Sequence, residues 1–135
     1  MSFLLDTCVV SEGVKTQPAE AVVRWMKARD PTSLFLSVVT LGELYFGVEQ
    51  LPEGKRRRGL EAWLAEVEQN YAGRVIVLDD AVARLWGRLR AESAGTALVD
   101  AQIAATAMTY GFTLVTRNLK DFTFAGLDVI NPWQG

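Results

Sequence analysis

The sequence contains no histidine and a single cysteine, Cys8. Without histidine the chain cannot form a Ser-His-Asp triad, a Cys-His nucleophile, a His-x-x-x-His zinc site or a paired-histidine acid–base system. With one cysteine it cannot form an internal disulfide or a zinc site built from several thiolates. If the protein is an enzyme, we expect its chemistry to depend on carboxylates.

Long hydrophobic runs are also absent. The longest apolar stretches, near residues 34–39 and 75–78, are far shorter than the ~20 residues that a membrane-spanning helix needs. The first residues lack a positively charged leader, and Asp6 precedes any apolar segment long enough for a signal peptide. We therefore expect a cytoplasmic protein without a membrane segment. A glycine-rich loop followed by lysine and serine or threonine is missing too, so nothing supports a P-loop nucleotide hydrolase.

The chain has 135 residues, half of them apolar, which suffices for one continuous core. We expect a single domain over residues 1–135. The formal net charge is −2, whereas domains that bind nucleic acid through bulk charge usually carry a strong basic excess. Any binding of nucleic acid must therefore be local.

Short apolar runs alternate with helical periodicity along the chain. Strands are predicted at residues 3–5, 34–37, 75–78, 113–116 and 127–130. Helices are predicted within residues 18–29, 41–48, 60–67, 82–89 and 100–110, the last ending at Gly111. Buried strands separated by helices predict an α/β sandwich with a mainly parallel sheet and helices on both faces. Ligand sites in such sheets lie beyond the carboxyl ends of the strands.

Three acids occupy strand ends or helix starts. Asp6 ends the first predicted strand, Glu43 lies three residues after Thr40, and Asp100 begins the alanine-rich helix. Each has a structural alternative: Asp6 and Asp100 as helix N-caps, and Thr40 with Glu43 as a capping box. Considered alone, none of the three proves a functional site.

Taken together, the three acids predict a metal site. They should converge at one edge of the sheet, where their like charges repel unless a cation neutralises them. Magnesium prefers oxygen ligands and commonly takes one or two carboxylates with waters and phosphate. A cluster without histidine therefore suits magnesium or manganese better than zinc. Such a metal can activate water and orient a phosphate, which implies phosphodiester hydrolysis.

Several segments, in order over nearly the whole chain, resemble a known family. They are residues 4–12 (LLDTCVVSE), 36–44 (LSVVTLGEL), 103–107 (IAATA), 114–122 (LVTRNLKDF) and 131–133 (NPW). These motifs are similar to those of PIN-domain ribonuclease toxins from type II toxin–antitoxin systems, in the VapC-like and FitB-like subgroup. The resemblance implies a PIN-like three-layer sandwich in which Asp6, Glu43 and Asp100 are the catalytic and metal-binding residues.

The resemblance also implies an activity and partners. The expected protein is a magnesium-dependent endoribonuclease, with manganese as a substitute ion. It forms a homodimer, and a cognate VapB-like or FitA-like antitoxin suppresses its cleavage of RNA. Two departures keep a second hypothesis open: Cys8 stands where the family usually has asparagine, and Asn118 where many relatives have a fourth aspartate. The alternative is a catalytically weak PIN-like module that binds RNA or an antitoxin.

Further candidates surround the predicted acidic edge. The resemblance leaves open whether Asn118 or Asp121 completes the site, and the hydroxyl groups of Thr7 and Thr116 suit the orientation of metal-bound water. Arg117 can hold a substrate phosphate through two parallel hydrogen bonds, or pair with a neighbouring acid. The basic run Lys55, Arg56, Arg57 and Arg58 is either a contact for RNA phosphates or a solvated helix start.

Overall fold

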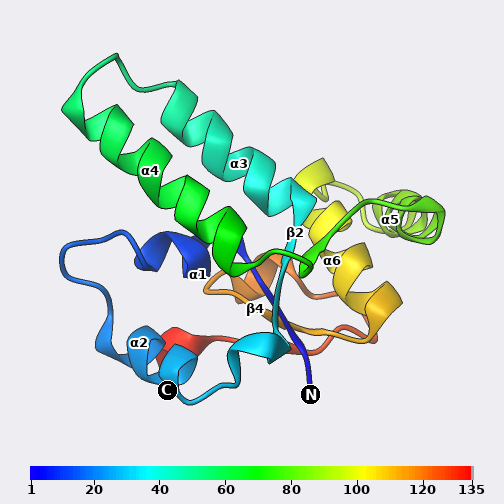
Figure 1. Cartoon of the computed structure of the whole chain (residues 1–135). Helices are drawn as coiled ribbons and strands as arrows, with labels where there is room; N and C mark the ends of the chain where they lie inside the picture. Colours follow the sequence, from blue (N-terminus) through cyan, green and yellow to red (C-terminus); the bar gives the residue numbers. More distant parts are fainter. Residues whose placement is uncertain (135) are drawn as a thin grey trace.

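The protein alternates helices and strands around a central sheet, as Figure 1 shows for the computed structural model, which describes residues 1–134. The strands are β1 (Phe3–Leu5), β2 (Leu34–Ser37), β3 (Val75–Ile76), β4 (Thr113–Val115) and β5 (Val129–Ile130). The helices are α1 (Thr7–Glu12), α2 (Glu20–Lys27), α3 (Val38–Glu49), α4 (Lys55–Asn70), α5 (Asp80–Glu92) and α6 (Leu98–Tyr110). Short 3-10 turns lie at Pro31–Ser33, Leu119–Asp121 and Pro132–Gln134.

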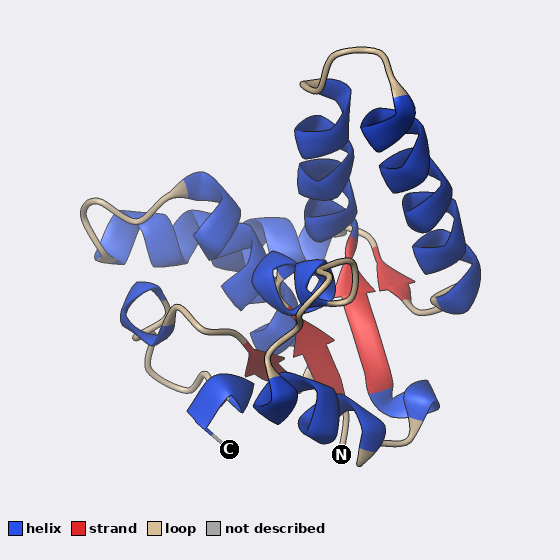
Figure 2. Cartoon of the chain, turned by 90° about the vertical axis from the view of Figure 1, so that its left-hand side faces the viewer, coloured by secondary structure: helices blue, strands red, loops and turns tan. Residues whose placement is uncertain are grey.

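The five strands form one sheet in the order β3-β2-β1-β4-β5, and every neighbouring pair is parallel. Phe3 of β1 lies opposite Leu34 on one side and Thr113 on the other. Because the strands run in the same direction, the ends of β1, β2 and β4 meet at one edge, from which α1 and α3 depart (Figure 2). The prediction of an α/β fold with a parallel sheet is confirmed.

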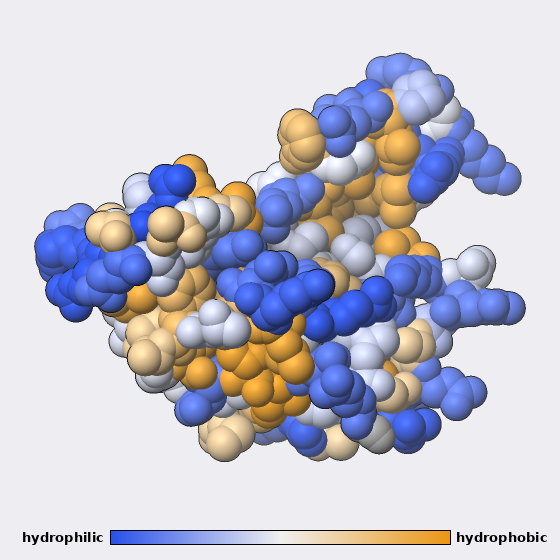
Figure 3. Space-filling model, turned by 180° about the vertical axis from the view of Figure 1, so that it is seen from behind, coloured by the Kyte–Doolittle hydropathy of each residue, from blue (hydrophilic) through white to orange (hydrophobic). Residues whose placement is uncertain are grey.

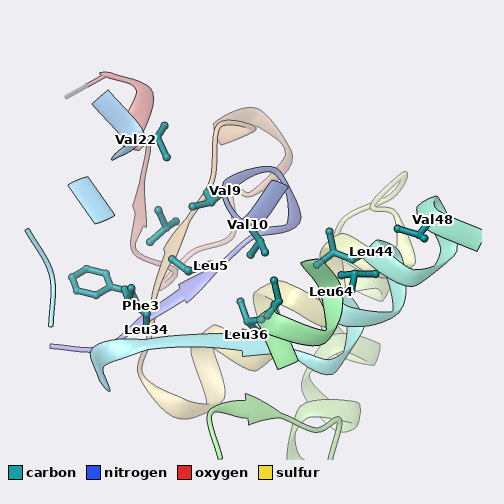
Figure 4. Packing of buried hydrophobic residues seen from close by; sticks show 12 residues of the cluster. Phe3, Leu5, Val9, Val10, Val22, Leu34, Leu36, Leu44, Val48 and Leu64 are labelled. Atoms are coloured by element: carbon teal, nitrogen blue, oxygen red, sulfur yellow. The ribbon is translucent and has the colours of Figure 1, made fainter. Parts of the chain in front are cut away.

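Two hydrophobic clusters lie on opposite faces of the sheet. Phe3 and Leu5 of β1 belong to the cluster that contains residues of α1, α2, α3 and α4, whereas Leu4 belongs to the cluster with α5 and α6. This alternation follows from the period of two in a strand, and it explains why β1 is apolar throughout. Figure 4 shows the first cluster, in which Leu36 of β2 and Leu64 of α4 are completely buried. The molecule is therefore a three-layer sandwich.

Helices α3 and α4 form a hairpin that projects from the body (Figures 1 and 2). Both are longer than predicted, since α3 follows β2 directly and α4 begins at Lys55. Seen from behind, hydrophilic side chains cover the outer end of this hairpin, and apolar surface lines the recess between the hairpin and the body (Figure 3). Periodicity identified only the part of each helix that packs on the core.

Two strands are shorter than predicted: the strand expected at 75–78 loses its last two positions, and the one expected at 127–130 loses its first two. β3 ends at Ile76, and Val77, which belonged to the predicted strand, is 62% exposed. β5 contains only Val129 and Ile130. Both are edge strands with one neighbour each, so fewer backbone hydrogen bonds extend them. Among residues 1–134, no helix is both long and apolar enough to cross a membrane.

Candidate active site

Asp6 lies at the carboxyl end of β1 and caps α1. Its Oδ1 accepts a hydrogen bond of 2.8 Å from the backbone N–H of Thr7, and its Oδ2 accepts one of 2.8 Å from the hydroxyl of Thr116. The side chain is buried, with 6% exposure. From the sequence, N-capping of a helix and metal binding were alternative roles for Asp6. One carboxylate can serve both roles, because each of its oxygens has further lone pairs.

Glu43 projects from α3 and contacts α1. Its Oε1 accepts a hydrogen bond of 2.7 Å from the hydroxyl of Thr7. The capping-box alternative is wrong, because Ser37 caps α3 by accepting a hydrogen bond of 3.1 Å from Val39, and Thr40 already lies within the helix. Glu43 is thus a mid-helix carboxylate directed toward the start of α1, beside Asp6.

Asp100 lies in the first turn of α6. The residue at the N-cap position is Ala97, so the capping alternative for Asp100 is also wrong. Burial raises the pKa of the Asp100 carboxyl, and the negative charges of Asp121, Asp6 and Glu43 raise it further. Like charges act in this way only at short range. The three predicted acids therefore share one electrostatic environment, to which Asp121 also belongs.

The structure separates the two candidates for a fourth acidic position. Asp121 lines a polar hollow of about 370 Å³ together with Asp100 and Lys120. Asn118 instead contributes its backbone N–H, which donates a hydrogen bond of 3.1 Å to the hydroxyl of Thr116. Asp121 is therefore the residue that adds negative charge beside Asp100, while Asn118 helps to fix the loop after β4.

Carboxylates supply the negative charge of the site, and their spacing limits how an ion can bind. Within residues 1–134, no three acidic or thiol side chains are close enough together to hold one metal ion directly. Magnesium commonly takes one or two carboxylates and keeps waters in its other positions. The donor set fits that mode, in which one or two of the acids would bind the ion directly and the others would reach it through its waters.

Cys8 lies next to the predicted metal ligands. Its thiol is 3.9 Å from Oδ2 of Asp6 and 3.7 Å from the hydroxyl oxygen of Thr116. Burial is the main cause that raises the pKa of this thiol, which keeps it protonated at neutral pH. A neutral thiol adds no charge to the site, so the carboxylates set its electrostatics.

Arg117 adopts the alternative role suggested by the sequence, pairing with an acid. Its Nη2 lies 3.6 Å from Oε1 of Glu12, and its guanidinium lies 4.1 Å from the centre of the Trp133 ring. Glu12 is buried, and its other oxygen accepts a hydrogen bond of 2.9 Å from the backbone N–H of Ala19. Sequence reasoning missed Glu12 because its pairing with Arg117 joins two distant parts of the chain.

The basic run at the start of α4 divides into residues with different surroundings. Arg57 folds back on the protein, donating to the carboxylate of Glu49 and to the backbone oxygen of Leu51. Lys55 and Arg56 line a separate hollow, and Arg58 is exposed outside it. The predicted RNA contacts of this run are therefore not equivalent.

Glu12 makes the stability of the protein depend on pH. The ammonium group of Lys15, which donates to Glu12, lowers the pKa of this carboxyl, as do the N–H of Ala19 and the charge of Arg117. A lowered folded-state pKa stabilises the protein above the unfolded value of about 4.3, and this contribution disappears as pH falls through the folded value. We expect Glu12→Gln to destabilise the protein at neutral pH and progressively less in acid.

Thermal unfolding from neutral to acid pH measures this effect. Glu20→Gln is the matched control, because Glu20 is exposed and lies 3.9 Å from Arg24 on α2. Its melting temperature should follow that of the unchanged protein at every pH. A Glu12→Gln curve parallel to the wild-type curve across the acid range would contradict the assignment.

The sequence matches the model of the PIN domain over residues 3–125. This match covers most of the chain, and the geometry above places the acids of the motifs at one edge of the sheet. The chain belongs to the PIN-domain family.

Curated relatives and solved structures agree with this assignment. The chain is 41% identical to VapC ribonuclease Y4jK of Sinorhizobium fredii and 37% identical to toxin FitB of Neisseria gonorrhoeae, covering 97% of this chain and 97% and 98% of theirs. Among structures, FitAcB from Neisseria gonorrhoeae superposes with a TM-score of 0.90 at 36% identity, covering 98% of this chain and 99% of that one. A toxin–antitoxin complex from Klebsiella pneumoniae gives 0.75 at 25% identity, covering 97% and 98%. The resemblance to VapC-like and FitB-like proteins is confirmed.

Proposed function

We propose that the protein is a metal-dependent endoribonuclease, and that it is the toxin of a type II toxin–antitoxin system. The observation that carries this proposal is that Thr7 contacts both Asp6 and Glu43 at the carboxyl edge of the sheet, and that the negative charges of Asp121, Asp6 and Glu43 add to burial in raising the pKa of Asp100. The names of its relatives, a VapC ribonuclease and a toxin, support the same activity.

In the proposed site, Asp6 and Glu43 bind magnesium or manganese, and Asp100 and Asp121 act through bound water. When bound, the ion supplies a polarised water and neutralises charge on the scissile phosphate. Thr116 holds Asp6 from the β4 side, and Thr7 connects the two acids, through its backbone N–H to Asp6 and its hydroxyl to Glu43. The acids are thus held in place before substrate arrives, which favours catalysis by positioning.

An antitoxin partner is part of the proposal. An apolar groove of about 370 Å³ lies between α1, α2 and α4, lined by residues that include Val10, Met26, Trp63 and Val67. Such a groove suits an extended or helical apolar segment of a partner. Because α1 begins at the acidic site and its later residues line the groove, we expect a segment bound in the groove to extend along α1 toward the acids. The toxin–antitoxin description of a structural relative is consistent with this arrangement.

Homodimer formation is also proposed. Several large apolar side chains are exposed, among them Phe46 of α3, Val77 after β3 and Leu98 of α6, with exposures of 66%, 62% and 41%. Where such residues form a contiguous patch, they mark a surface at which subunits meet. Analytical ultracentrifugation of the purified protein, with and without Phe46→Ser, tests the assignment.

The second candidate is a PIN-like module that binds RNA or an antitoxin and cleaves poorly. The thiol of Cys8 beside Asp6 favours it, since a thiol donates only a weak hydrogen bond. The two functions differ in turnover, because a binding module gives no metal-dependent products.

Cleavage of a mixed cellular RNA pool tests the proposed function. The purified, antitoxin-free protein is incubated with magnesium, with manganese or with a chelator, and the products are separated by size. The nuclease predicts fragments with either metal and none with the chelator. Intact RNA under all three conditions, from protein whose folding is confirmed by circular dichroism, would favour the binding module.

A further inference from the structure

A wide hollow of about 990 Å³ lies between the loop after α1 and the first turns of α4. Val14 and Leu60 contribute apolar surface to it, and Lys15, Lys55 and Arg56 contribute positive charge. We call these five residues with Thr16, Gln17 and Gly59 the basic hollow. It is separate from the acidic site, and the metal chemistry described above makes no use of it.

Two of its cations are available to bind a ligand. Within residues 1–134, the side chains of Lys55 and Arg56 form no ion pair or hydrogen bond, and both residues are exposed. The next residue, Arg57, is only 20% exposed and is held by Glu49 and Glu61. The protein has thus neutralised one cation of the run and left two unneutralised ones facing a hollow, in a chain whose net charge is negative.

The basic hollow is connected to the acidic site through α1. Thr7 contacts Glu43 at the start of this helix, and Glu12 contacts both Lys15 and Arg117 at its end. The six residues of α1 correspond to a length of about 9 Å at 1.5 Å per residue. A flexible polyanion whose phosphate lies at the acids can therefore extend past the end of α1 into the hollow, where Lys55 and Arg56 lie.

We propose that the basic hollow binds the sugar-phosphate backbone of single-stranded RNA next to the scissile phosphodiester. Lys55 and Arg56 contact phosphates, and the apolar surface of Val14 and Leu60 accommodates a ribose or an unstacked base. This inference rests on the proposed ribonuclease function and deepens it, because it identifies where substrate lies outside the acids. RNA is favoured over an acidic peptide because the hollow begins one short helix from a site built for a phosphate.

Binding of a short fluorescent single-stranded RNA of mixed sequence tests the inference. Fluorescence anisotropy is measured in chelator, which prevents metal-dependent cleavage, over a series of salt concentrations. We compare the full chain with Lys55→Gln/Arg56→Gln and with a control on α5, Arg84→Gln/Arg88→Gln. The control removes the same charge from exposed positions outside the hollow. Thermal unfolding of all three proteins establishes that they are folded.

Two lost phosphate contacts should reduce the slope of log K against log salt by about 1.4, since each contact to single-stranded RNA contributes about 0.7. Loss of these two contacts should weaken RNA binding about 25-fold at ~0.1 M salt. The control should keep the wild-type slope. An equal loss of RNA affinity in both double variants, or no loss of affinity in either, would overturn the inference.

A polyglutamate peptide of matched charge distinguishes the class of ligand. If it displaces the RNA as well as unlabelled RNA does, the hollow binds anions in general and the assignment to RNA is overturned. Failure of the proposed nuclease function would give a different result: the wild-type protein would leave RNA uncleaved in the presence of magnesium. Selective loss of binding in Lys55→Gln/Arg56→Gln together with intact RNA would support the basic hollow and refute the nuclease.

Discussion

Asp6→Asn is expected to reduce metal-dependent RNA cleavage by roughly 10²- to 10³-fold, the usual effect of removing one preorganised electrostatic group from an active site. The substitution removes a negative charge and changes the side-chain volume little. The amide oxygen of asparagine can still accept the hydrogen bond from the N–H of Thr7 and cap α1. The loss should therefore appear in activity and metal binding, with little change in melting temperature.

Initial rates with a fluorogenic RNA, over a range of magnesium concentrations, measure this effect. Asp128→Asn is the matched control, because Asp128 is exposed and precedes β5, at the opposite edge of the sheet from the acids. This control should cleave at the wild-type rate. Unchanged turnover by Asp6→Asn would exclude Asp6 from the site, even if the wild-type protein is a nuclease.

The sequence contained enough information to predict the position of the acids. Leu4 and Leu5 are apolar neighbours that face opposite sides of the sheet, so the run before Asp6 indicated a strand buried on both faces. A buried parallel strand that ends in an acid places that acid at the carboxyl edge. The same reasoning applied to residues 34–37 and 113–116, and it predicted which strand ends meet.

Helix starts were harder to predict, because several polar residues competed for each N-cap. Ser37 precedes Thr40, and both can cap a helix, but β2 ends at Ser37 and α3 begins at once. At α6 the cap position is held by Ala97, whose side chain forms no hydrogen bond. Propensity favours a polar cap, but tertiary packing sets the first turn of each helix. Because the N-caps are Ser37 and Ala97, the carboxylates of Glu43 and Asp100 are not used for capping and are available to the site.

Long-range ion pairs were beyond sequence reasoning. Glu12, Arg117 and Trp133 come together only because α1, the loop after β4 and the last turn of the chain meet beside the sheet. No spacing rule connects residues so far apart. The pairing also changes the interpretation of Arg117, since its charge is directed to Glu12 in the absence of RNA. It fixes the residue that follows Thr116, and Thr116 in turn holds Asp6.

Thr116→Val is expected to weaken magnesium binding by about 10- to 100-fold, as is usual when a hydrogen-bond partner of a metal ligand is removed. The Thr116 side chain is fully buried, and its hydroxyl donates to Asp6 and accepts from the N–H of Asn118. Valine keeps the shape but leaves the buried carboxylate oxygen of Asp6 without this donor, which costs about 1–3 kcal/mol of folding free energy. The N–H of Asn118 belongs to an exposed residue and can bond to water instead.

Titration calorimetry with magnesium, chemical unfolding and cleavage rates separate positioning of Asp6 from a purely structural role. Thr116→Ser restores the hydroxyl and removes one methyl group, at a cost of about 0.8 kcal/mol in burial. It should therefore recover wild-type metal affinity while remaining slightly less stable. If the serine and valine variants bind magnesium equally, the hydroxyl does not position Asp6. If only the valine variant loses affinity, the hydrogen bond from β4 is what holds this carboxylate in the orientation that binds the ion.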